Sequence, residues 1–144
     1  CSSPALETLR LIRFLDYRVR DMNTAIWIAQ ILLALAFAGS GLSKLLQPYD
    51  KLAAQMAYVN DFTPGVIRAI GTLEILGAIG TMLPTLTGIL PWLTPAAAFG
   101  LAVNMGGAMS THLRRKEYPV IIINLVLLAL AGFVVYGRLV AVPR

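Results

Sequence analysis

One acidic residue, Glu74, lies near the middle of a long apolar stretch of the chain. An ionised carboxylate at the centre of a bilayer costs at least about 2.5 kcal/mol, so such a residue is seldom kept without a partner or a proton. The chemistry open to it is binding the polar end of a ligand, or accepting and releasing a proton. The alternative is a protonated or paired carboxylate with a purely structural role.

Four further polar residues are predicted to lie at related depths if the apolar stretches cross a bilayer as helices. At 1.5 Å of rise per residue, Glu74 lies roughly 12 to 14 Å, and Asn104 roughly 13 Å, from the same membrane face. Asn124 lies roughly 8 to 9 Å from that face, and Lys44 and His112 lie within about one turn of it. These residues belong to four different stretches. The sequence therefore predicts a polar funnel that opens on this face and narrows to Glu74 and Asn104.

Each of the other four residues also has a plainer explanation. Asn104 and Asn124 could serve only as hydrogen bonds between helices, which are worth about 1 kcal/mol or less in membranes. Lys44 could extend its ammonium group to the lipid headgroups. His112 lies one residue before a basic cluster and could be an ordinary interfacial histidine.

The sequence offers few residues for metal or covalent chemistry, because it holds one histidine and one cysteine, Cys1. This set cannot form the first shell of zinc or of a bis-histidine haem, so we expect no metal site. A single cysteine also excludes a dithiol relay carried by this chain alone. There is no glycine-rich phosphate loop and no serine triad. We therefore expect no catalytic residues and no independent catalytic activity.

The elements that must position these residues are four apolar stretches, at residues 25–46, 65–83, 92–113 and 118–136. Hydrophobic residues make up 58% of the 144 residues and charged residues 13%, a balance that a soluble domain of this size could not hide in one core. A bilayer-crossing helix needs roughly 20 mostly apolar residues. The predicted fold is therefore an all-α membrane protein, with a four-transmembrane-helix bundle in a domain of residues 22–144.

The net charge of +5 comes from basic residues at the ends of these stretches. Such placement is typical of contact with anionic headgroups rather than with nucleic acid. The expected membrane-surface anchors are Arg114, Arg115, Lys116, Trp27 and Trp92. The predicted partner is thus the lipid bilayer, and we expect no nucleic-acid partner.

Two segments outside the four stretches are also predicted to be helical. Residues 51–59 have apolar positions at helical spacing, which favours a short interfacial helix between the first two spans. Residues 1–21 form a basic amphipathic N-terminal segment with four arginines in eleven residues. This segment is either a helix on the membrane surface, or an upstream or non-native extension.

Four sequence patterns, in this order and spacing, resemble those of the DoxX-like membrane proteins. They are GLSKL at 41–45, EILGAIG at 74–80, LP at 83–84 with PWLTP at 91–95, and HLRRKEYP at 112–119. The resemblance extends over about residues 22–138. It implies a four-helix bundle in a bacterial inner (plasma) membrane, and it places Lys44, Glu74 and His112 at the family's recurrent polar positions.

The resemblance also implies a range of functions. Some members of the broader DoxX group are linked to quinone or thiosulfate oxidation or to thiol-stress complexes, and others are assembly chaperones. The first hypothesis is a non-catalytic, redox-associated accessory module that binds a quinone or another small amphiphile around Glu74, with no covalently bound cofactor. The alternatives are a structural or assembly subunit of a larger membrane complex or homo-oligomer, and a small transporter or proton path.

Overall fold

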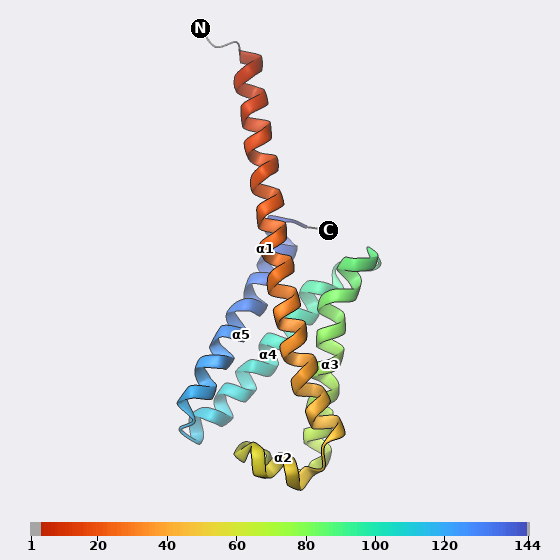
Figure 1. Ribbon diagram of the computed structural model, residues 1–144, viewed down its shortest axis with the longest axis vertical. Helices are drawn as coiled ribbons and strands as arrows, with labels where there is room; N and C mark the ends of the chain where they lie inside the picture. The colour runs from red at the N-terminus through yellow and green to blue at the C-terminus, as the bar shows by residue number, and fades with distance from the viewer. Residues whose placement is uncertain (1–3, 144) are drawn as a thin grey trace.

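The computed structural model describes residues 4–143, and this part of the chain is built from helices joined by short connections (Figure 1). Cys1 lies outside the described residues. The elements in chain order are α1 (Pro4–Leu46), α2 (Tyr49–Gln55), the 3₁₀ helix η1 (Ala57–Asp61), α3 (Pro64–Thr87), α4 (Leu93–Arg114), α5 (Tyr118–Tyr136) and the π-helical turn η2 (Gly137–Ala141).

The first helix is much longer than the sequence indicated. We expected a span beginning near Ala25, whereas α1 runs unbroken for 43 residues from Pro4. Its first half projects away from the other helices (Figure 1), and every residue from Pro4 to Asp21 is exposed. The described part of the basic N-terminal segment is thus a straight continuation of the first span, because no proline or glycine interrupts the helix between Ala5 and Ala38.

The end of α3 also differs from the expectation. The second apolar stretch was expected to end at residue 83, but α3 continues through Pro84 to Thr87. A proline in the last turn removes only one hydrogen-bond donor, and the helix tolerates this loss. The helix ends where Gly88 adopts a left-handed conformation, with φ of 71° and its amide donating to the Pro84 carbonyl at 2.9 Å.

The helices are arranged so that two connections lie at one end of the bundle and one lies at the other. Figure 1 shows α2 and the α4–α5 turn at the lower end, and the α3–α4 connection with the C-terminus at the upper end. The segment that was expected to form an interfacial helix is present as two short helices, α2 and η1. Leu52 of α2 and Val59 of η1 form a small core with Ile67 of α3.

A central apolar core joins the four long helices. It contains Leu33 and Phe37 of α1, Ala78 of α3, Leu101 of α4 and Ala131 of α5, together with Met105. Small side chains in this set let the helix backbones approach closely.

The outer faces of the helices are apolar and exposed, as lipid contact requires. Leu35, Leu73, Phe99 and Ile122 are each more than 60% exposed. Within residues 4–143, three segments are long and apolar enough to cross a bilayer: Pro4–Leu46, Pro64–Thr87 and Tyr118–Ala141. The chain is therefore a multi-pass membrane protein.

Candidate functional site

A cavity of about 1090 Å³ lies between the lower halves of the long helices and is bordered by η1. All five polar residues predicted to form the funnel line it: Lys44, Glu74, Asn104, His112 and Asn124. They come from all four long helices, because the fixed rise of each helix brings these positions to similar levels. Apolar side chains, among them Phe37, Ile70, Ile123 and Leu127, line much of the remaining wall.

The wall of the cavity holds a buried ion pair between α1 and α3. The Nζ atom of Lys44 lies 2.9 Å and 2.8 Å from the two carboxylate oxygens of Glu74, and both side chains are only 4% exposed. Lys44 also donates to the hydroxyl of Ser40, one turn earlier on α1. Lys44 is thus paired inside the protein and does not extend to headgroups, and Glu74 is a paired carboxylate.

The α1–α3 crossing that aligns this pair depends on two glycines. A Cβ atom on Gly41 would meet the Gly71 carbonyl oxygen at 2.7 Å, and one on Gly71 would meet the Lys44 Cβ at 2.8 Å. Arg68 of α3 then secures the end of α1, since its guanidinium donates to the backbone carbonyls of Lys44 and Gln47 at 2.8 Å and 3.0 Å, and also to that of Leu45. These are carbonyls of the last helical turn and its exit, which lack partners within the helix.

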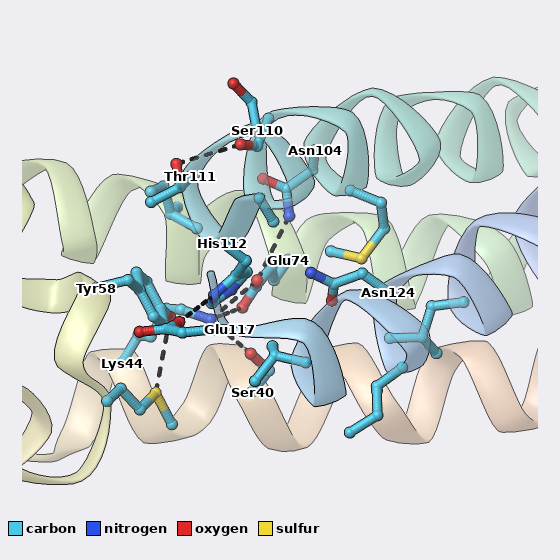
Figure 2. Close-up of a pocket in the computed structure, with 18 of the residues that line it drawn as sticks. Ser40, Lys44, Tyr58, Glu74, Asn104, Ser110, Thr111, His112, Glu117 and Asn124 are labelled. Carbon is cyan, nitrogen blue, oxygen red and sulfur yellow. Dashed lines mark hydrogen bonds and ion pairs between the residues drawn. The ribbon is translucent and has the colours of Figure 1, made fainter. Parts of the chain in front are cut away.

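Two asparagines complete the set of five polar residues that line the cavity, called here the polar ring: Lys44, Glu74, Asn104, His112 and Asn124. The amide of Asn104 donates to Glu74 at 3.4 Å, so it joins α4 to the ion pair. Asn124 on α5 is 7% exposed, and its amide nitrogen is buried with no hydrogen-bond acceptor among the residues described. Figure 2 shows Asn124 beside the other labelled side chains of the cavity. A buried donor without an acceptor carries a free-energy cost that a bound ligand can remove.

His112 sits at the lower end of the cavity, in a network that the sequence did not reveal. Its Nδ1 lies 2.6 Å from a carboxylate oxygen of Glu117, in the α4–α5 turn. The other Glu117 oxygen accepts from Nε of Arg115 at 2.9 Å, and Arg115 also binds both oxygens of Asp61 in η1 at 2.9 Å. The hydrogen bonds from His112 and then Arg115 hold the pKa of Glu117 below its ordinary value.

Tyr58 of η1 lies at the same lower end of the cavity as His112. Its ring meets the His112 ring edge to face, with centroids 5.1 Å apart. Burial raises the pKa of the Tyr58 hydroxyl above its ordinary value, and Lys44 partly opposes this shift. Ser40, Tyr58 and Glu117 line the cavity but were absent from the predicted set. Only Glu117 left a sequence signal, as an acidic residue directly after a basic cluster.

The predicted surface anchors fall into different environments. Arg114, Arg115 and Lys116 are exposed at the lower end, and Trp92 is 60% exposed near the upper end. Trp27 is instead partly buried and lies under the guanidinium of Arg138 at 5.4 Å. Among residues 4–143, no group of three or more histidine, cysteine, aspartate or glutamate side chains could hold a metal ion.

The amino-acid sequence of the chain matches a family model. The model of the DoxX-like family covers residues 28–134. The chain belongs to the DoxX-like family. The match spans the whole of the cavity's polar ring, from Lys44 to Asn124, and it confirms the resemblance drawn from the sequence. Comparison with curated proteins and with solved structures gives no match.

The DoxX-like chain also has a second polar cluster, near the upper end of the bundle. Gln30 donates to the carbonyl of Thr81 and accepts from Nε of Arg138 at 2.8 Å. The hydroxyls of Thr85 and Thr94 share a hydrogen bond of 2.8 Å beside it. Arg138 is 4% exposed, so this cluster holds a buried arginine.

Proposed function

We propose that this DoxX-like protein binds a small neutral amphiphile in the cavity beside Lys44 and Glu74, as a non-catalytic, redox-associated accessory module. A quinone is the candidate ligand, because it joins a ring with polar edges to an apolar tail. The observation that carries the proposal is the cavity of about 1090 Å³, in which a charge-balanced ion pair and an unpaired amide share the wall with apolar side chains. This volume lies just above the usual range of about 300 to 1,000 Å³ for small-molecule sites.

The proposal includes a membrane topology in which α4 is the fourth span of a bacterial inner-membrane protein. α4 has 22 residues, which at 1.5 Å per residue gives about 33 Å, enough for the hydrocarbon core. It lacks a stretch as hydrophobic as those in the other three long helices, because it carries Asn104, Ser110, Thr111 and His112. Asn104 and His112 are bonded to Glu74 and Glu117 at the cavity rather than facing lipid, and this placement supports a fourth crossing.

A binding experiment with ubiquinone-1 tests the proposal. The protein in nanodiscs is compared with Asn124→Leu and with a matched control, Gln47→Leu. The side-chain oxygen of Gln47 is also buried without a hydrogen bond among the described residues, but Gln47 is not part of the cavity wall. We expect saturable binding that weakens about tenfold in Asn124→Leu and stays unchanged in Gln47→Leu.

The outcomes separate the site from nonspecific uptake. Native mass spectrometry of the same samples should show one bound quinone on the wild type. A quinone signal equal in both variants contradicts the proposed site. A protein partner with no bound small molecule favours the accessory-subunit alternative.

One observation supports that structural alternative. A second hollow of about 590 Å³ lies against α3 and α4, and its lining includes Leu73, Gly77, Phe99 and Gly100. Small residues at such a surface allow another helix to approach closely. Docking of a neighbouring membrane subunit there is compatible with ligand binding inside.

A transport path has less support. An apolar segment separates the polar residues of the cavity from those of the upper cluster along α1, along α3, along α4, and between Asn124 of α5 and Arg138 of η2. On α1, Leu33 and Phe37 lie between Gln30 and Lys44, and both are at most 1% exposed. Moving a polar solute between the two clusters would require this core to open.

A further inference from the structure

The pairing of His112 with Glu117 fixes the position of a hydrogen on the imidazole. The Glu117 oxygen lies 2.6 Å from Nδ1, and the same carboxylate accepts from Arg115 at 2.9 Å. An ionised carboxylate is only an acceptor, so Nδ1 must carry the hydrogen of this bond. In a neutral ring the lone pair then lies on Nε2, the nitrogen at the other edge.

Nε2 has no hydrogen-bond partner among the described residues. The contacts of His112 are the bond to Glu117 and the edge-to-face contact with Tyr58. The residue is 5% exposed and lines the cavity (Figure 2). The result is an oriented hydrogen-bond acceptor at the cavity wall, carried by a residue that is itself largely buried. A carboxylate that holds a histidine in one tautomer in this way is a common means of preparing the ring for a second partner.

The other strong polar groups of the cavity are already engaged. Lys44 has three N–H donors, and they match three acceptors, the Ser40 hydroxyl and the two Glu74 oxygens. The ion pair is therefore balanced, and it offers a charged ligand no net attraction. Among the groups that remain for a ligand are an acceptor at His112 Nε2 and a donor at the Asn124 amide, which is buried without a partner in the described part of the chain.

These contacts point to the chemistry of the ligand's polar end, and the inference rests on the proposed function. We propose that Glu117 is a positioning residue that holds His112 in the Nδ1–H tautomer, so that Nε2 accepts a hydrogen bond from a ligand hydroxyl. The cavity then favours a phenol or hydroquinone over the same ring without a hydroxyl donor. The hydroxyl proton stays on the ligand oxygen, and no covalent bond is formed.

The tautomer is directly measurable because His112 is the only histidine in the chain. Protein labelled with ¹⁵N-histidine, in nanodiscs at pH 8, gives a single imidazole in the NMR spectrum. We expect a protonated Nδ1 and an unprotonated Nε2. Glu117→Leu should give a mixture of tautomers, whereas the control Asp61→Asn, which leaves the His112–Glu117 bond in place, should not. A wild-type ring protonated at Nε2 overturns the inference.

Ligand preference is the second test. The probes are 2,3,5-trimethylhydroquinone and its dimethyl ether, which has the same ring without hydroxyl donors. We expect the wild type to bind the hydroquinone about fivefold more tightly, the value of one hydrogen bond. The preference should vanish in His112→Phe, fall in Glu117→Leu, and persist in Glu117→Gln, which keeps an oxygen acceptor for Nδ1–H.

The results distinguish the inference from the proposed function. Equal binding of both probes by the wild type overturns the inference and leaves the cavity as a ligand site. Absence of binding for both probes and for ubiquinone-1 overturns both. A full hydroquinone preference in Glu117→Leu shows that Glu117 has no positioning role.

Discussion

The buried Lys44–Glu74 pair allows a quantitative test by a double-mutant cycle of Glu74→Gln, Lys44→Met and the double variant. Both side chains are 4% exposed and lie 2.8 Å apart. Removing one partner leaves the other charge buried without compensation, which typically costs about 3 to 5 kcal/mol. Replacing both removes the cost of burying two charges as well as their attraction.

The structure places Glu74→Gln near the lower end of that range. A glutamine oxygen can still accept from Lys44, which now donates at 2.8–2.9 Å, so one hydrogen bond survives while the charge pairing is lost. We therefore expect a loss of about 3 kcal/mol, which is more than a hundredfold in the unfolding equilibrium. Lys44→Met should lose a comparable amount, and the double variant should lie within about 1 kcal/mol of the wild type. The two single losses then sum to about 6 kcal/mol, so the expected coupling is about 5 kcal/mol or more.

Reversible unfolding with SDS in mixed micelles, followed by circular dichroism, gives these free energies. Thr72→Val is a matched control, because Thr72 lies on the same helix but is exposed. Additive losses in the two single variants, or a Glu74→Gln protein as stable as the wild type, would refute the reasoning. Either result would mean that the pair is solvated or separated in the membrane.

Two further predictions concern the helix crossing and the lower network. Gly41→Ala should destabilise the protein by about 1 to 3 kcal/mol, because its Cβ would press on the Gly71 carbonyl. Gly39→Ala is the control, because a Cβ at Gly39 would meet open space, and it should be neutral or slightly stabilising. Thermal unfolding measures both variants, and equal unfolding midpoints would contradict the close approach of α1 and α3. The pKa of Glu117 is lowered in the folded protein, so its stabilising contribution should be fully present above the unfolded pKa of about 4.3 and be lost as pH falls through the folded value. Unfolding titrations from pH 7 to pH 3 should show a shallower acid decline in Glu117→Gln, and identical slopes would argue against the His112–Glu117 bond.

The polar ring could be located from the sequence because helix geometry is regular. Glu74 and Asn104 were placed at one level from the rise per residue alone, and they share a hydrogen bond of 3.4 Å. The pairing of Lys44 with Glu74 was not anticipated. It depends on the rotation of α1 against α3 and on the close crossing at the glycines, and neither follows from the depth of a residue in its own helix.

Other parts of the site lay beyond sequence reasoning for different reasons. Glu117 belongs to a turn and Tyr58 to a short 3₁₀ helix. In such elements the spacing of apolar residues does not indicate which way a side chain points. The polar cluster around Arg138 was missed because a basic residue at the end of a span is normally an anchor. The continuous α1 was missed because charge in its first half was taken as the boundary of the span, although arginine and leucine are both good helix formers.

The length of α1 has a mechanical consequence. Forty-three residues at 1.5 Å each give a rod of about 64 Å, roughly twice the hydrocarbon thickness of a bilayer. If residues 4–21 were a flexible chain, the position of its N-terminal end would vary by about the chain's own r.m.s. end-to-end distance. The continuous helix instead holds that end at a fixed height and direction relative to the bundle. A label near Thr8 would therefore report tilting of α1 as a large displacement, magnified from small rotations about the crossing at Gly41.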